Sequence, residues 1–363
     1  PNSCFAAYQE WLVPLLIQVP HCLLLRAITQ GHSQYRKLKQ RKERRTELTK
    51  YENDSTACRL CPRSCGADRS KGMGRCHVDN QIRVARAALH MWEEPCISGK
   101  EGSGAVFFSG CSLGCVFCQN RDISGGKAGL VISGGRLTEI FLELQEQGAN
   151  NINLVTAGHY AAQVKESLEA ARGKGLHIPV VYNSSGYEKE ETIKMLEGLV
   201  DIYLPDLKYL DSELAGRYSK APDYPKYATE AIAEMVRQQP TPEFDEEGRM
   251  LRGVIVRHLL LPGHVREAKH VVKYLYETYG DQIYISMMNQ YTPMQETFED
   301  PLLNRRVTKR EYQRWLDYAA DLGVTNGFYQ EGGTAKESLI PAFNYEGVLQ
   351  TADKKKDIFA DIE

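Results

Sequence analysis

Three cysteines, Cys111, Cys115 and Cys118, stand close together with the spacing C-x3-C-x2-C. Glycines at positions 110 and 114 let the backbone curl between them. Three thiolates at this spacing can hold three corners of an iron–sulfur cube and leave one iron without a protein ligand. A structural zinc site would need a fourth cysteine or histidine nearby, which the loop does not offer, and a disulfide would leave one of the three thiols unpaired. The spacing therefore predicts a cluster with one iron open to chemistry.

A second cysteine group precedes this loop, with the spacing C-x2-C-x3-C-x10-C. Its members are Cys58, Cys61, Cys65 and Cys76. Four thiols form a complete tetrahedral ligand set, and the glycines at 66, 72 and 74 permit tight turns. Zinc and an auxiliary iron–sulfur cluster both use four thiolates, and spacing does not separate them. We therefore expect a metal here, either zinc or a second cluster.

From residue 104 onward, short β-branched runs alternate with helical patterns, which is typical of parallel β/α units. The predicted strands cover residues 105–109, 151–156, 178–182, 200–204, 253–260 and 282–287. Apolar residues at 137, 140, 141 and 144 recur at helical spacing. A later helix opens with Thr308 and Glu311 as a capping box and runs to about Leu322. Six such units predict an α/β fold of the partial (β/α)6 barrel kind.

Polar side chains follow each predicted strand. After the first come the cysteines of the 111–118 loop, and later strands lead into His159, residues 183–185, residues 206–208, Arg257 with His258, and residues 288–291. In parallel barrels the active site lies at the carboxyl ends of the strands. A single histidine such as His159 would be interpreted as a structural residue, and the Asp206–Lys208 pair alone as an ordinary salt bridge. Polar side chains at the ends of all six predicted strands together indicate a functional site.

Phe117 just before the last loop cysteine, and Gln119 and Asn120 just after it, complete a motif that resembles the signature of the radical S-adenosylmethionine (SAM) superfamily. The likeness is to the branch related to pyruvate formate-lyase activating enzymes, and it runs from about residue 57 to 330. The resemblance implies a partial (β/α)6 radical SAM-type barrel, preceded here by a small N-terminal cysteine-rich metal-binding segment.

The resemblance also implies roles for residues. Cys111, Cys115 and Cys118 would ligate a [4Fe–4S] cluster whose open iron takes the amino and carboxylate groups of SAM, and Phe117 would pack on the adenine. Asn183 and Ser185 would contact the ribose or methionine part. The full set of expected cofactor contacts is Phe117, Asn120, Thr156, Asn183, Ser185, Asp206, Lys208 and His258.

One departure from the relatives is plain. After the second strand they carry Gly-Gly-Glu to receive the SAM amino group, whereas this chain reads Thr156-Ala157-Gly158-His159. Gly134-Gly135 precedes a helix and is no substitute. The partner of the SAM amino group is left open.

The implied function is that of a radical SAM enzyme, an oxidoreductase that reductively cleaves SAM to a 5′-deoxyadenosyl radical and abstracts hydrogen from a substrate. A reducing electron donor is the expected partner. Activation of a glycyl radical partner protein is the first hypothesis, and modification of a peptide side chain or small molecule is the second. A zinc-stabilised nucleic-acid-binding protein is the least favoured, because it leaves the 111–118 loop unexplained.

The chain has 363 residues, a formal net charge of −2 and ten cysteines. The near-zero charge gives no argument for nucleic acid or membrane as a partner. Cysteines in metal-like spacings favour a reducing, cytoplasmic compartment. An organellar presequence stays open, because the stretch before Glu43 holds one acidic residue, Glu10.

Four segments are expected: a helical and basic arm over 1–56, a cysteine-rich metal-binding segment over 57–100, the barrel over 101–330 and a tail over 331–363. Residues 11–28 carry two prolines, a histidine and an arginine, which makes them a poor membrane span. They also lack the leader of a signal peptide. The basic run 36–45 is interpreted as a solvated linker in preference to a nucleic-acid contact.

Overall fold

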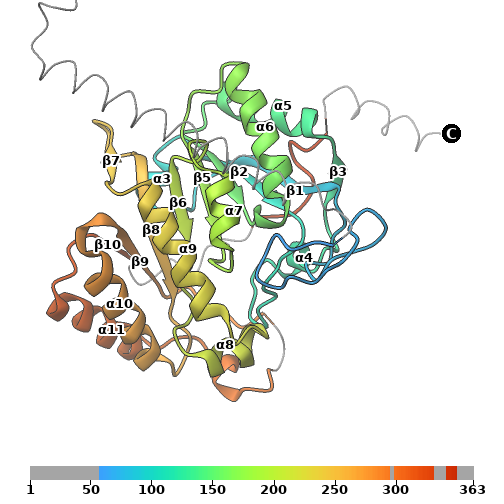
Figure 1. Cartoon of the computed structure of the whole chain (residues 1–363). Helices are drawn as coiled ribbons and strands as arrows, with labels where there is room; N and C mark the ends of the chain where they lie inside the picture. Colours follow the sequence, from blue (N-terminus) through green and yellow to red (C-terminus); the bar gives the residue numbers. More distant parts are fainter. Residues whose placement is uncertain (1–56, 295–297, 331–340, 350–363) are drawn as a thin grey trace, which may run out of the picture. The chain divides into compact units, whose positions relative to one another are not determined.

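The computed structural model describes residues 57–294, 298–330 and 341–349, all of which belong to the unit Asp54–Glu363. In this part of the chain the strands form one sheet in the order β10-β9-β8-β6-β5-β4-β2-β1-β3, with β7 paired to β8 (Figure 1). The predicted arm over 1–56, its basic run, and residues 331–340 and 350–363 of the predicted tail lie outside the described residues.

Most of the sheet is parallel. Its parallel strands are β2 (Ser103–Phe108), β4 (Ile152–Val155), β5 (Val180–Ser184), β6 (Ile202–Pro205), β8 (Met250–Leu259), β9 (Tyr284–Met288) and β10 (Gly327–Tyr329). Each of the six predicted strands overlaps one of these. The α/β class and the parallel sheet are therefore confirmed, and the strand order is that of an open barrel.

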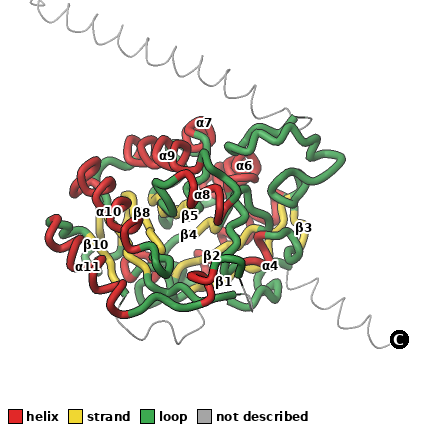
Figure 2. Tube along the Cα trace, turned by 90° about the horizontal axis from the view of Figure 1, so that it is seen from below, coloured by secondary structure: helices red, strands yellow, loops and turns green. Residues whose placement is uncertain are grey.

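Helices cover the outer face of the sheet (Figure 2). The longer ones are α5 (Gly134–Glu146), α6 (Ala161–Gly173), α7 (Glu190–Met195), α8 (Ser212–Ser219), α9 (Tyr224–Gln238), α10 (Val265–Tyr279) and α11 (Lys309–Leu322), and the short ones are α3 (Pro95–Ser98) and α4 (Arg121–Ser124). The 3-10 turns are η1 (Gly158–Tyr160), η2 (Gly280–Gln282) and η3 (Pro301–Asn304). The capping box of Thr308 and Glu311 is present at the start of α11, as predicted.

An antiparallel edge was not predicted. It consists of β1 (Ile82–His90), which pairs with β2, and β3 (Leu130–Ile132), which pairs with β1; β7 (Glu243–Phe244) adds a short hairpin strand elsewhere. Because β1 and β2 share a ladder, one sheet extends across the boundary predicted at residue 100.

The described part of the predicted tail is also held by the barrel. Glu346 accepts a hydrogen bond at its carbonyl from the N–H of Ala87 over 2.8 Å, and Tyr345 donates its N–H to the carbonyl of Ala85 over 3.1 Å. Val348 is fully buried. Residues 341–349 thus pack along β1.

The segment after β1 crosses the amino end of the barrel. Asn151 donates from Nδ2 to the carbonyl of Ile97 over 2.8 Å, just before β4 begins. Cys96 and Ile97 of α3 pack against residues of β5, β6 and β8 that face the interior, namely Val181, Ile202, Leu204 and Ile255. Apolar side chains of α3 therefore pack into the interior at this end of the barrel.

Within the residues that the structure describes, no helix is both long and apolar enough to span a membrane.

Candidate active site

A cavity of about 560 Å³ lies among the carboxyl ends of the parallel strands. Its lining includes Cys111, Cys115, Phe117, Cys118, Asn120, Thr156, Asn183, Ser185, Asp206 and Lys208. The fold thus brings together the three loop cysteines and every expected cofactor contact except His258. A volume of this size is within the range of about 300–1,000 Å³ usual for small-ligand sites.

The cysteine loop is shaped by its two glycines. Gly110 and Gly114 have φ of 94° and 71°, where a side chain is rarely tolerated. A Cβ at Gly110 would also lie 2.8 Å from the carbonyl oxygen of Cys76. The curl that the sequence predicts is therefore required both by backbone conformation and by close packing.

Hydrogen-bond donors surround the loop sulfurs. Ser219 donates its hydroxyl to Sγ of Cys115 over 3.0 Å, and the N–H of Leu113 points to Sγ of Cys111 over 3.4 Å. Burial raises the pKa of Cys111, and it raises the pKa of Cys115 to about 12, while the charge of Lys208 acts in the opposite direction on both. The site therefore offers donors and a nearby cation to thiolates formed on metal binding.

These residues fit a [4Fe–4S] cluster with three protein ligands. In the described part of the chain, no three His, Cys, Asp or Glu side chains are arranged to hold a single metal ion. An iron–sulfur cluster does not need that arrangement, since each thiolate binds a different iron. Three thiols facing one cavity leave a coordination position that a small ligand in the cavity can reach.

Phe117 forms part of the cavity wall. It is 6% exposed, and its ring meets Tyr218 and Tyr291 edge to face at centroid distances of 6.4 and 6.3 Å. Such edge-to-face contacts fix the orientation of a ring. The aromatic residue that the motif places beside the last cysteine is thus held against the cavity by two tyrosines.

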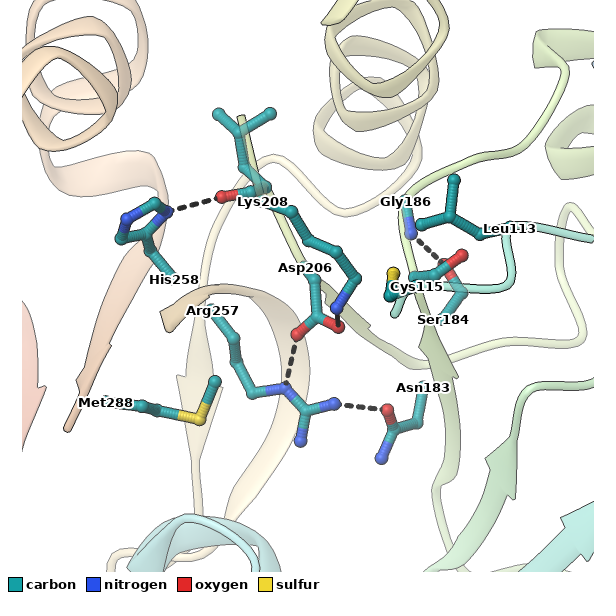
Figure 3. A network of polar contacts seen from close by, with 12 residues as sticks. Leu113, Cys115, Asn183, Ser184, Gly186, Asp206, Lys208, Arg257, His258 and Met288 are labelled. Carbon is teal, nitrogen blue, oxygen red and sulfur yellow. Dashed lines mark hydrogen bonds and ion pairs between the residues drawn. The ribbon is translucent and has the colours of Figure 1, made fainter. Parts of the chain in front are cut away.

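A charged network crosses the interior of the barrel (Figure 3). Asp206 accepts from Nζ of Lys208 over 2.6 Å and from Nε of Arg257 over 3.2 Å, and Arg257 also donates to the amide oxygen of Asn183. Burial opposes the ionisation of Asp206, but Lys208 and Arg257 outweigh it and hold the pKa of Asp206 below its usual range. The network is therefore charged, with Asp206 between two cations.

Two further carboxyl groups that the sequence reasoning missed also line the cavity. Glu93 pairs through Oε2 with Nη1 of Arg257 over 3.1 Å and accepts at Oε1 from Asn153 over 3.0 Å. Burial raises the pKa of its neighbour Glu94, whose Oε2 is buried without a hydrogen-bond partner in the described part of the chain. The sequence offered only an adjacent acidic pair before Pro95 as a signal.

His258 does not line the cavity, so the structure gives no support to its expected cofactor contact. Its Nδ1 donates to the carbonyl of Leu207 over 2.7 Å, and its ring meets Trp315 edge to face at 5.3 Å. Burial lowers the pKa of His258 to about 4. Because neighbouring residues of a strand point to opposite faces, Arg257 faces the interior and His258 faces the helices.

Thr156 stands where relatives are expected to carry Gly-Gly-Glu. Its φ is 62°, a left-handed conformation that a β-branched residue rarely adopts. Its N–H donates to the carbonyl of Asn183 over 2.8 Å and so continues the ladder of β4 and β5. Backbone strain of this kind, of the order of 1–3 kcal/mol, often accompanies a functional site.

The four cysteines of the N-terminal group are brought near one another outside the cavity. Cys61 and Cys76 are buried, Cys58 is half-buried and Cys65 is exposed, and all four are free thiols. The metal expected there stays a prediction.

The profile of the radical SAM superfamily matches residues 105–275, from β2 to α10. An uncharacterized protein of Methanocaldococcus jannaschii is 28% identical to the chain over 269 residues, which is 72% of this chain and 74% of the relative. Among solved structures, Streptococcus suis SuiB bound to S-adenosylmethionine is similar with a TM-score of 0.40 and 15% identity, over 64% of this chain and 51% of SuiB.

SuiB bound to its precursor peptide SuiA gives the same TM-score and identity, over 62% of this chain and 48% of SuiB. The chain thus spans about half the length of SuiB. The family match covers the cysteine loop and the strand ends that carry Asn183, Asp206 and Lys208. The part of the chain over residues 105–275 thus matches the radical SAM superfamily, whose cofactors are a [4Fe–4S] cluster and SAM.

Proposed function

We propose that this protein is a radical SAM enzyme that abstracts hydrogen from a substrate reaching the cavity at the carboxyl end of the barrel. The observation that carries the proposal is that the three loop cysteines and the Asp206 network line one cavity. When bound, the cluster supplies the electron that cleaves SAM to methionine and a 5′-deoxyadenosyl radical, which takes hydrogen from the substrate.

The residues of the chain bind and orient these groups. Cys111, Cys115 and Cys118 are the cluster ligands. SAM carries a carboxylate and an ammonium group, and the cavity offers charges of both signs, with Lys208 as a donor and Asp206 as an acceptor. Glu94 is the acceptor with an oxygen still without a partner among the described residues, which makes it a candidate for the ammonium in place of Gly-Gly-Glu.

Apolar packing at the amino end of the barrel supports exclusion of water from the reaction. Cys96 and Ile97 pack in the interior there, and Phe117 forms an apolar wall of the cavity. A reactive radical requires a site that bulk water does not enter.

The cavity size supports a substrate that projects inward. About 560 Å³ is the volume of one drug-sized ligand site, so SAM would leave room for only a part of a larger molecule. A protein loop or peptide fits this description. We place activation of a glycyl radical partner first on this ground, and a peptide side chain or a small molecule second.

The test compares cysteine variants under anaerobic reconstitution. Cys115→Ala removes a cluster ligand, and Cys96→Ala removes a buried thiol that does not line the cavity. We expect Cys96→Ala to release 5′-deoxyadenosine like the wild type and Cys115→Ala to release none. Cleavage by Cys115→Ala at the wild-type rate would refute the assignment of the cluster. The glycyl partner is tested by an organic radical signal that appears in the partner only with SAM present.

A further inference from the structure

The segment 57–79, here called the cysteine knuckle, has no helix or strand of its own. Its turns are closed by main-chain bonds such as Cys58 to Ala67 and Gly66 to Cys58, both 3.0 Å long. Few of its side chains are buried, so it lacks a core. A short segment without a core is usually held by disulfides or a metal, and its cysteines form no disulfide.

The four thiols of the knuckle lie close together. A Cβ built on Gly74 would be 3.2 Å from Sγ of Cys76 and 3.7 Å from Sγ of Cys65, so both sulfurs flank one glycine. Cys58 and Cys76 are near enough to Cys61 for their charges to raise its pKa, although burial is the main cause. Gly74 is thus a position where a side chain would push two of the sulfurs aside.

A buried cation lies beside these sulfurs. Arg69 is 4% exposed, and its Cδ lies 3.6 Å from the same Cβ position on Gly74. Its guanidinium donates to the carbonyls of Asp79 and His159 and lies over the ring of Tyr160, and it pairs with no carboxylate among the described residues. A buried charge needs a counter-charge. Thiolates of Cys65 and Cys76 would provide it, since four thiolates carry more negative charge than a metal centre neutralises.

The last knuckle cysteine is bonded to the cysteine loop of the barrel. The N–H of Cys111 donates to the carbonyl of Cys76 over 3.1 Å. A side chain at position 110 would clash with that carbonyl oxygen, which explains the glycine there. The two cysteine groups are therefore joined through one hydrogen bond between their own ligand residues.

Arg63 makes a second connection. Its Nε and Nη2 donate to the carbonyls of Ser112 and Leu113 in the cysteine loop, over 2.9 and 3.0 Å. Nη2 also donates to the carbonyl of Ser219, whose hydroxyl bonds the sulfur of Cys115, and the guanidinium lies 5.2 Å from the ring centroid of Tyr187. One knuckle side chain thus fixes the backbone on both sides of the radical cluster.

We propose that Cys58, Cys61, Cys65 and Cys76 bind a second metal centre, zinc or an iron–sulfur cluster, and that this centre holds the radical-cluster loop in place through Cys76 and Arg63. Both kinds of centre take four thiolate ligands. The hydrogen bond from Cys111 to Cys76 and those from Arg63 to Ser112 and Leu113 connect the centre to the loop. Its role in holding the loop rests on the proposed function.

Metal analysis tests the second centre. The wild type should contain about four irons in the radical cluster together with either one zinc or about four further irons, and Cys65→Ala only the first four irons, because a [4Fe–4S] cluster holds four. Cys65 is exposed, so its loss leaves no core cavity, and Met73→Ala, at an exposed knuckle residue, is the matched control that keeps the wild-type metal content. No metal beyond the first cluster would overturn the site itself.

A triple variant separates this inference from the proposed function. Replacing Cys111, Cys115 and Cys118 by Ala removes the radical cluster but should leave the zinc or the irons of the knuckle in place. That metal content is independent of SAM chemistry. A wild type that cleaves no SAM would refute the proposed function while a triple variant that keeps the knuckle metal would still support the second centre, and a triple variant without metal would overturn the centre.

The link between the centres has its own test. Arg63→Gln should keep the wild-type metal content and yet weaken SAM binding about three- to tenfold, with a changed electron paramagnetic resonance spectrum of the radical cluster, because two hydrogen bonds to its loop and one to Ser219 are lost. Lys in place of Arg63 should restore part of the affinity. Unchanged affinity and spectrum in Arg63→Gln would overturn the link.

Discussion

Ser219, the last residue of α8, donates its hydroxyl to the sulfur of Cys115 over 3.0 Å. The same oxygen lies 3.0 Å from the hydroxyl of Tyr209, and both side chains are buried. A helix that follows the fourth barrel strand in the sequence therefore supports a ligand of the cluster held by the first. Hydrogen bonds to cluster sulfurs tune the reduction potential.

Ser219→Ala should make the cluster harder to reduce. Loss of a hydrogen bond of about 1 kcal/mol from a cluster thiolate lowers the reduced fraction at a fixed potential about fivefold. A redox titration followed by electron paramagnetic resonance measures this. Ser212→Ala, at the exposed start of the same helix, is the matched control. Equal midpoint potentials for Ser219→Ala and the wild type would show that the hydrogen bond from Ser219 to Cys115 does not affect reduction of the cluster.

The adjacent carboxyl groups of Glu93 and Glu94 should respond differently to the same substitution. Glu93→Gln breaks a buried ion pair with Arg257 and should lower the free energy of unfolding by about 3 kcal/mol. Glu94→Gln should cost less than about 1 kcal/mol, because burial already favours the neutral form of Glu94. Denaturant unfolding of the two variants provides the comparison. Equal costs would contradict the assignment of Glu93 as the partner of Arg257.

Loss of one carboxylate charge should weaken SAM binding more when the residue lines the cavity than when it lies outside the cavity. Asp206→Asn leaves Lys208 without its partner and should weaken SAM binding more than about tenfold, as measured by equilibrium dialysis. Asp201→Asn breaks a similar pair with Arg172, 2.8 Å long, that does not line the cavity. It should lower stability but leave SAM affinity unchanged. A similar affinity loss in both would show that Asp206 acts only through the fold.

His258 should make the protein sensitive to mild acid. Burial lowers its pKa to about 4, while an unfolded histidine has a pKa near 6.5, so the unfolded state binds the proton first as pH falls. The stability that neutral His258 contributes is present above pH ~6.5 and is lost as pH falls toward ~4, by about 3 kcal/mol in all.

His258→Asn removes the proton-binding ring, so its free energy of unfolding should fall less steeply across this range than that of the wild type. His270, which is 61% exposed, gives the control variant His270→Asn, whose pH curve should match the wild type. Parallel curves for His258→Asn and the wild type would contradict the assignment of His258 as a buried neutral group.

The sequence predicted what local patterns determine. Strands such as 151–156 and the capping box at Thr308 depend on residues close in the chain, and all of these are present. The cysteine loop was found because its ligands are close in sequence. The expected cofactor contacts follow from the family resemblance, and all of them except His258 line the cavity.

What the sequence missed depends on long-range packing. The ion pair of Glu93 with Arg257 joins residues 164 positions apart, and no local pattern indicates it. The family resemblance implied a cofactor contact for His258, and composition does not show whether Arg257 or His258 faces inward. The edge strand β1 mixes small and charged residues, and its pairing with β2 and with residues 341–349 becomes evident only in the fold.

The most direct test of the central claim is the amount of 5′-deoxyadenosine and methionine released when the reconstituted, reduced protein is incubated with SAM without oxygen. The claim predicts both products in equal amounts from the wild type, and neither from Cys115→Ala. A wild type that assembles its cluster and binds SAM in the cavity, but releases neither product under reduction, would contradict it.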